Sequence, residues 1–250
     1  MQGLHVASNR KYAAAVLTRP PQEWDVNEKL AVRALATSLG EAANIRREQV
    51  LASCVDGYKE ALYLLERSGD GPAAAICAFN LGQTYGNLTA ILDLDIAEGW
   101  YRRSLELQQA EDNMARAGCF LQLGSVAYQR FVSARASRRL SEEIFGYLSL
   151  AGRYYHQALE LCPSEAVQEL AATYNQLGTV YAEAGQLSQA VTYFQESVRY
   201  KEVMRDRFAA GGTRHNVGTI LAAASVSRRL ANGLSRPCGT LRLATMRTKM

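Results

Sequence analysis

The stretch YNQLGTVYAEAGQLSQAVTYFQES, residues 174–197, contains two blocks of residues at helical spacing. In the first block Leu177, Gly178 and Tyr181 stand at positions i, i+1 and i+4, which puts the leucine and the tyrosine on one stripe of a helix. The second block has a small, an aromatic and a small residue, separated by four and then three positions. Its members are Ala190, Phe194 and Ser197. Together the blocks predict two amphipathic helices that face each other.

Two earlier stretches repeat both blocks, and a motif that recurs at intervals of this length predicts a repeat array. The first block recurs as Leu81-Gly82 with Tyr85 and as Leu123-Gly124 with Tyr128. The second block recurs as Ala97, Tyr101 and Ser104 and as Ala151, Tyr155 and Ala158. Weaker copies are Leu39-Gly40 followed by Cys54, Tyr58 and Ala61, and Asn216-Val217-Gly218 with Leu221. The sequence therefore predicts three strong units and two atypical terminal ones.

The glycine of the first block has a packing reason. Glycine in a helix costs about 1 kcal/mol relative to alanine, so its recurrence indicates that another helix passes close to it. Small and large residues that alternate across two helices interlock at such a crossing. Each unit is then a helical hairpin whose apolar face is covered only when neighbouring hairpins stack on it.

These residues resemble the tetratricopeptide repeat (TPR), in which Leu-Gly and Tyr are followed by Ala, Phe and Ala. The distances between the glycines are 42, 54 and 40 residues, longer than the family's usual period of about 34. They are similar to the longer-helix arrays of kinesin light chains and of bacterial signalling proteins. The resemblance covers residues 28–224. It implies an all-α fold, a right-handed superhelical solenoid of antiparallel helix pairs with four to five units.

Flanking segments lack the motif. Residues 1–24 are predicted to be a flexible leader, with an organelle-targeting peptide as the alternative, residues 25–225 the repeat domain, and residues 226–250 a basic tail that is disordered or non-native. From residue 228 the chain has six basic residues and no acidic or aromatic one. Because a shifted reading frame with suitable codons restores the small-large-small spacing there, we hypothesise a frame slip near residue 225. Nucleic-acid binding by the tail is disfavoured, since it offers no stacking residue.

Nothing in the sequence predicts catalysis or a cofactor. The chain has no phosphate-binding G-x-x-x-x-G-K-[ST] loop and no G-x-S-x-G elbow, and its three histidines form no i, i+4 pair that would hold a metal. An enzyme, such as a hydrolase on a helical scaffold, is therefore the least favoured hypothesis. Five widely spaced cysteines and the lack of a membrane-length apolar stretch or a secretory signal favour a cytoplasmic protein with reduced thiols and no membrane partner.

The resemblance implies that the first helix of each unit lines a concave face. The predicted partner-binding groove consists of Asn80, Gln83, Asn87, Gln122, Gln129, Arg130, Asn175, Gln176, Thr179, Glu183, His215 and Asn216. In the last four units the residue two before the motif glycine is an amide (Asn80, Gln122, Gln176, Asn216), and side-chain amides can both donate to and accept from an extended peptide. The alternative is that these residues form an ordinary solvated helix face.

The first hypothesis is thus a scaffold that binds a protein or peptide in the groove. The alternative is a sensor or regulatory TPR fragment of a larger bacterial signalling NTPase or transcriptional regulator. The segment from Arg130 to Arg139 holds four arginines and no acid, so it is either a solvated face or a site for an acidic or phosphate-bearing partner. The oligomeric state does not follow from the sequence.

Overall fold

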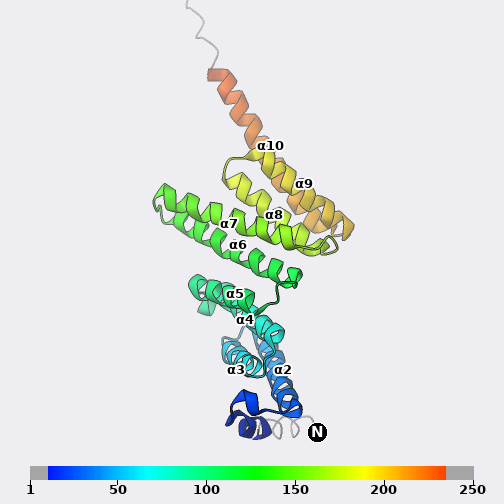
Figure 1. Cartoon of the computed structure of the whole chain (residues 1–250). Coiled ribbons are helices and arrows are strands. Elements are labelled where there is room, and N and C mark those ends of the chain that lie inside the picture. The colour runs from blue at the N-terminus through cyan, green and yellow to red at the C-terminus, as the bar shows by residue number, and fades with distance from the viewer. Residues whose placement is uncertain (1–10, 235–250) are drawn as a thin grey trace, which may run out of the picture.

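This computed structural model describes residues 11–234, which contain helices and no β-strand (Figure 1). The helices are α2 (Val26–Glu48), α3 (Cys54–Arg67), α4 (Gly71–Asn87), α5 (Leu94–Leu107), α6 (Asn113–Ala136), α7 (Ser141–Leu161), α8 (Val167–Glu183), α9 (Leu187–Val203) and α10 (Arg207–Leu234). Short 3₁₀ helices cover Pro21–Glu23 and Thr89–Ile91. A further helix covers residues 11–17.

The helices pack as consecutive pairs. The pairs α2–α3, α4–α5, α6–α7 and α8–α9 have the most extensive contacts, each pair touches the next, and α10 packs against α9. Figure 1 shows the pairs following one another along a line, with α2 and α10 far apart. The prediction of an all-α array of helix pairs is confirmed, with four complete pairs and a first helix of a fifth within the described residues.

Within each strong unit, the motif glycine lies directly beneath the aromatic residue of the second helix. A Cβ atom added to Gly124 would lie 2.5 Å from the ring of Tyr155, a distance that non-bonded carbon atoms do not reach. The equivalent distances are 2.6 Å for Gly82 and Tyr101 and 2.7 Å for Gly178 and Phe194. The two helices can therefore approach only because the glycine has no side chain.

The small residue that ends the second block has a second role where it is serine. Buried Ser104 donates its hydroxyl hydrogen bond to the carbonyl of Ala75 at 2.8 Å, and Ser197 does the same to Ala171 at 2.8 Å. Each bond joins the second helix of a unit to its first. A buried hydroxyl without such a partner would be unfavourable, so these bonds also fix the register of the hairpin.

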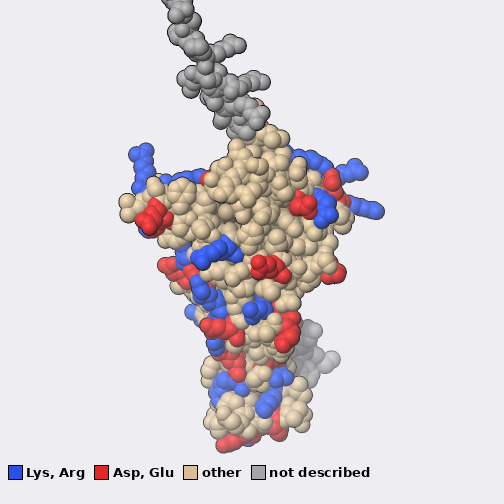
Figure 2. Space-filling view, turned by 45° about the horizontal axis from the view of Figure 1, so that its top comes forward, with Lys and Arg blue, Asp and Glu red and all other residues tan. Residues whose placement is uncertain are grey.

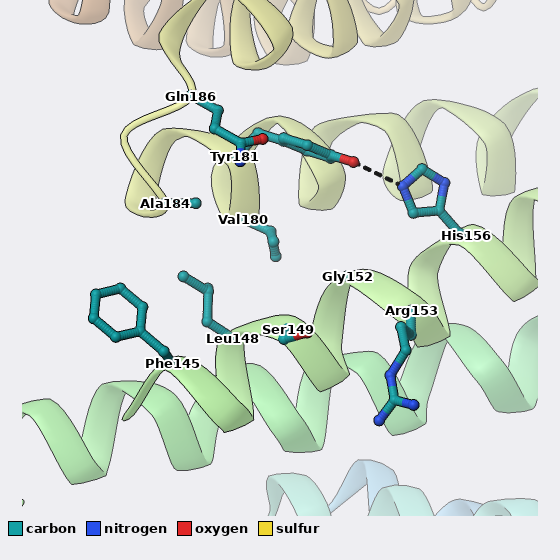
Figure 3. Close-up of a pocket in the computed structure, with 10 residues that line it drawn as sticks. All are labelled: Phe145, Leu148, Ser149, Gly152, Arg153, His156, Val180, Tyr181, Ala184 and Gln186. Carbon is teal, nitrogen blue, oxygen red and sulfur yellow. Dashed lines mark hydrogen bonds between the residues drawn. The ribbon is translucent and has the colours of Figure 1, made fainter. Parts of the chain in front are cut away.

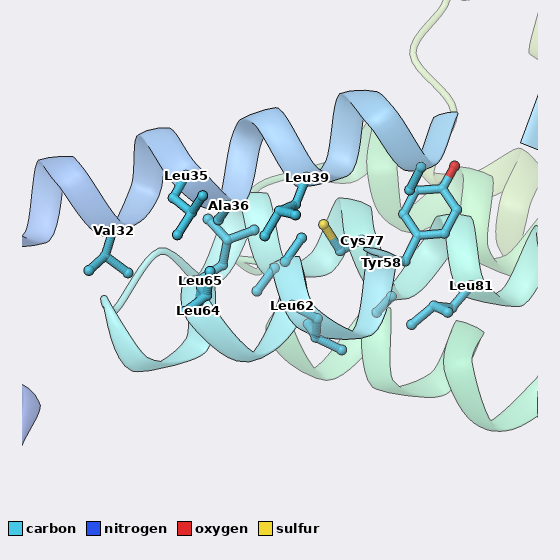
Figure 4. Close-up of a cluster of buried hydrophobic side chains, with 14 of the residues drawn as sticks. Val32, Leu35, Ala36, Leu39, Tyr58, Leu62, Leu64, Leu65, Cys77 and Leu81 are labelled. Atoms are coloured by element: carbon cyan, nitrogen blue, oxygen red, sulfur yellow. The ribbon is translucent and has the colours of Figure 1, made fainter. Parts of the chain in front are cut away.

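The first unit is built differently from its prediction. Leu39 is buried, but a Cβ added to Gly40 would meet nothing within 4 Å. The close approach lies instead at Gly57 of α3, where a Cβ would be 3.1 Å from that of Ala43. Figure 4 shows α2 and α3 facing each other through Leu35, Leu39 and Leu62. In this pair the glycine at the helix crossing therefore lies on the second helix, whereas in the strong units it lies on the first.

Part of the predicted flexible leader belongs to the core. Ala13, Val16 and Trp24 are 0%, 2% and 4% exposed and pack with α2 and α3. The Trp24 indole donates to the carbonyl of Arg19 at 3.2 Å, and the Arg67 guanidinium stacks 5.2 Å above its ring centre. These residues cover the outer face of the first pair, which otherwise would meet water. Residues 1–10 lie outside the described part of the chain.

Val16→Ala is therefore expected to lower the free energy of unfolding by about 1–2 kcal/mol, because two buried methyl groups are lost. The matched control is Val26→Ala, since Val26 is 73% exposed, and it should change stability by less than about 0.5 kcal/mol. Urea denaturation followed by circular dichroism measures both. If both substitutions change the free energy of unfolding by the same small amount, residues 11–17 do not contribute to the core and are a leader as predicted.

The helix that follows the fourth pair is longer than predicted. The predicted repeat domain ends at residue 225, whereas α10 extends to Leu234; five of the nine added residues are alanine, leucine or arginine, which have high helix propensity. Most of the predicted basic tail, residues 235–250, lies outside the described residues. The frame-slip hypothesis thus stays a prediction that the DNA sequence tests.

Between residues 11 and 234, no helix combines the length and the apolar character that crossing a lipid bilayer requires.

Candidate functional site

A cleft of about 520 Å³ lies between the first helices α8 and α10, and it is called the α8–α10 groove below. Thr179, Ala182 and Glu183 of α8 form one wall, His215, Asn216, Thr219 and Ile220 of α10 form the other, and Phe194 lies between them. Four residues of the predicted groove therefore meet at one place. They are Thr179, Glu183, His215 and Asn216.

A polar network holds α10 in position beside this groove. Lys201 of α9 donates to the hydroxyl of Thr213 at 2.6 Å, and that hydroxyl lies 3.2 Å from Oδ1 of Asn175 on α8. Thr213 is only 2% exposed. Burial lowers the pKa of Lys201, and nearby Asp206 opposes this effect. Asn175 was predicted to face a partner, but its amide oxygen serves to join α8 to α10.

Other predicted groove residues also bridge neighbouring first helices. Arg47 of α2 donates to Gln83 and to Asn80 of α4, and Asn80 in turn donates to Asn44 at 3.4 Å. Farther along the array, Glu183 accepts from Arg135 of α6. These side chains connect successive units, so a partner would have to displace them or bind over them.

Arg130 lies away from the α8–α10 groove. It forms ion pairs with Asp95 at 2.6 Å and with Glu98, both on α5, and only 19% of its side chain is exposed. Burial disfavours the charged form of Glu98, but hydrogen bonds from Arg102 and Arg130 outweigh burial and hold the pKa of Glu98 below its usual value. A separate cleft of about 320 Å³ between α5, α6 and α7 lies beside Arg130.

The other arginines of the 130–139 segment are mostly paired as well. Arg135 meets Glu183, and Arg139 meets Glu143 at 2.6 Å. Only Arg138 has no acidic partner within the described residues. The segment therefore acts mainly through contacts within the chain, and the structure offers little free positive charge there for an acidic partner.

The remaining predicted groove residues keep their side chains available. These are Asn87, Gln122, Gln129 and Gln176, whose side chains make no hydrogen bond to any described residue, and the same holds for His215 and Asn216. Gln122, Gln176 and Asn216 occupy the position two before the motif glycine in three units. Part of the predicted row of amides is thus free to bind, whereas Asn80 is already engaged.

A third pocket, of about 420 Å³, lies between α7 and α8 and is lined by none of the predicted groove residues (Figure 3). Leu148 and Phe145 of α7 lie opposite Val180 of α8, and Phe145 is 60% exposed. Nε2 of His156 lies 3.1 Å from the Tyr181 hydroxyl at one end of the pocket. Phe145 belongs to neither block of the motif, and Tyr181 is predicted to belong to the packing stripe. The sequence therefore did not predict that these two residues line one pocket.

The described residues contain no group of three His, Cys, Asp or Glu side chains that could hold a metal ion. Cys54, Cys77 and Cys119 are buried free thiols. Burial raises the pKa of Cys77 to about 11, which keeps this thiol protonated and unreactive at neutral pH. Cys238 lies outside the described residues.

No protein-family model and no curated protein matches the sequence. The structure is similar to the crystal structure of BtubC (BKLC) from P. vanneervenii, with a TM-score of 0.51, 16% identity, and coverage of 98% of this chain and 97% of that chain. BtubC is a bacterial kinesin light chain and a TPR protein.

The chain has a TPR-like fold. At this level of identity the similarity is one of fold, and it extends over nearly the whole of both chains. The predicted resemblance to the longer-helix arrays of kinesin light chains is confirmed.

Proposed function

We propose that this TPR-like array is a non-catalytic scaffold that binds an extended segment of a protein partner in the α8–α10 groove. The observation that carries the proposal is the meeting of Thr179, His215 and Asn216 around a cleft of about 520 Å³. Repeat arrays present such surfaces along their inner helices. Buried free thiols fit a reducing compartment, so we place this function in the cytoplasm.

The chemistry of the groove suits a peptide backbone. The amide of Asn216 can donate and accept at once, and the imidazole of His215 adds a further polar contact. The hydroxyl of Thr219 already donates to the carbonyl of His215 at 3.0 Å, so it can accept from a partner. Ile220 and Phe194 supply an apolar floor for a side chain of the partner. A few convergent polar groups over an apolar floor are typical of binding clefts.

The test starts from peptides selected from a random display library against the purified chain. His215→Ala combined with Asn216→Ala is expected to weaken the binding of the selected peptides about tenfold or more, a loss of about 1.4 kcal/mol. Both residues are exposed and make no side-chain hydrogen bond within the described residues, so the melting temperature should not change. Fluorescence anisotropy measures the affinity.

The control for this pair is Gln195→Ala, an exposed residue of the second helix α9, which should leave the affinity unchanged. Selected peptides that bind equally well to the groove variant and to the wild type would remove the α8–α10 groove from the proposed function.

A further inference from the structure

The helix α10 has the burial pattern of a first helix. Thr213 and Thr173, each five residues before the glycine of its unit, are 2% and 1% exposed. Gly218 therefore occupies in α10 the position that Gly178 occupies in α8. A helix packed beside α10 would therefore contact residues that stand at the same distances from Gly218 as the contacts of α9 stand from Gly178.

The place that the aromatic residue takes in the complete units is open at Gly218. A Cβ added to Gly178 would lie 2.7 Å from Phe194, whereas a Cβ added to Gly218 would meet nothing within 4 Å. Leu221 on the same side of α10 is 55% exposed. Within the described residues, no helix follows α10 to cover this side.

A positively charged cleft of about 590 Å³ lies at the start of this open side, between the end of α9 and the first turns of α10. It is lined by Glu202, Arg205, Arg207, Ala210 and Arg214, and is called the end cleft below. Arg214 pairs with Glu202, but Arg205 and Arg207 have no acidic partner among the described residues. Figure 2 shows basic side chains projecting at the right-hand edge of the molecule, with acidic side chains beside them.

The complete units show which residue of a second helix would enter the end cleft. Six residues after the aromatic of α5 comes Leu107, whose carbonyl oxygen would lie 3.2 Å from a Cβ on Gly71. Gly71 stands eleven residues before its motif glycine, and the equivalent residue of α10 is Arg207.

The fourth unit shows a second contact made by the residue that stands six positions after the aromatic. Six residues after Phe194 comes Tyr200, whose ring stacks on Tyr174 with 5.6 Å between ring centres. Tyr174 stands four residues before its motif glycine, and the equivalent residue of α10 is Arg214. At this position of a docked helix the backbone would therefore lie beside residue 207, and the side chain would lie over residue 214, within the end cleft.

We propose that the open side of α10 binds an acidic amphipathic helix of a partner protein. The helix runs antiparallel to α10, places an aromatic residue on Gly218, and places an aspartate or glutamate six residues later in the end cleft, with Arg207 and Arg214. Charge complementarity selects this occupant. Residues 235–250 as they stand in this sequence do not fit, because they carry four basic residues and neither an acidic nor an aromatic one. A DNA sequence that shows the frame slip hypothesised near residue 225 would supply a second helix from the chain itself and would overturn the proposal.

The proposal concerns a different face from the α8–α10 groove, which is lined on α10 by His215, Asn216 and Thr219. Its probe is a synthetic 18-residue peptide with the pattern Ala-x-x-x-Phe-x-x-Ala-x-x-Glu on a helix-favouring background. Fluorescence anisotropy with the full chain is expected to show binding that weakens tenfold or more with Arg207→Glu. A peptide with lysine in place of that glutamate should restore binding to this variant.

Two further variants show whether a loss of binding arises from the open side of α10. Circular dichroism checks that every variant is folded. Gly218→Leu fills the place of the aromatic and should also weaken binding tenfold, whereas His215→Ala with Asn216→Ala should leave binding of this peptide unchanged. The proposal is overturned if the peptide does not bind, if Arg207→Glu and Gly218→Leu have no effect, or if light scattering shows a dimer that Gly218→Leu dissociates, since a second copy would then cover this side.

Discussion

Phe194→Ala is expected to lower the free energy of unfolding by about 3–5 kcal/mol, the range for removal of a buried aromatic ring. Phe194 is 2% exposed, fills the space above Gly178, and lies between the walls of the α8–α10 groove. Its loss would leave a cavity where three helices meet. Urea denaturation followed by circular dichroism measures the change.

Phe208→Ala is the matched control, because Phe208 is 95% exposed on α10. Its expected effect on the free energy of unfolding is within about 0.5 kcal/mol of zero. If both variants lose the same small amount, the packing of the fourth pair does not depend on this ring, and the assignment of the second block as a core motif fails.

Gly178→Leu is expected to lower the free energy of unfolding by about 1–3 kcal/mol, as overpacking of a core does. The new Cβ would lie 2.7 Å from the Phe194 ring, so either the ring or one of the two helices must move. Leucine has the higher helix propensity by about 1 kcal/mol, which means that the loss arises from packing alone.

Gly99→Leu on α5 tests the same substitution without the crowding. A Cβ at Gly99 would meet nothing within 4 Å, and the residue is exposed, so this variant should be as stable as the wild type or slightly more stable. An unchanged melting temperature for Gly178→Leu would speak against the glycine-aromatic contact as the reason for the motif.

The contacts inside each strong unit could be predicted because they depend on residues close in sequence. Gly124 and Tyr155 belong to consecutive helices, and their positions within each block fix which faces meet. Leu39-Gly40 carries the same dipeptide but not the same contact. There the crossing is set by Gly57 of the partner helix, and a dipeptide on one helix does not report where the other helix crosses it.

The burial of residues 11–24 could not be read from the motif because it depends on distant residues. Arg67 donates to the carbonyl of Leu17 at 3.1 Å across 50 positions of sequence, and it also stacks on Trp24. A short apolar segment followed by Pro20-Pro21 has the same sequence pattern whether or not the rest of the chain provides a surface that buries it. Tertiary contacts therefore decided this part of the fold.

The candidate site was predicted in part for a comparable reason. Thr179 and Asn216 meet across the α8–α10 groove because their spacing from the motif glycine determines the helix face on which they stand. The same spacing does not reveal the partners that occupy Asn175 and Arg130, which lie on other helices. The pocket beside Phe145 had no signal, since that residue lies outside the motif.

The central claim is that each of the three strong units is held by its own glycine-aromatic contact and that the units stack in line. A double-mutant cycle on Gly178→Leu and Phe194→Ala tests it most directly. The leucine should fill part of the cavity left by the ring, so we expect the double variant to be more stable than the sum of the single losses by about 1 kcal/mol or more.

Gly178→Leu combined with Tyr101→Ala, in the second pair, provides the comparison, since distant sites add within about 0.5 kcal/mol. Additive losses for Gly178 and Phe194, or equal coupling in both cycles, would contradict the account.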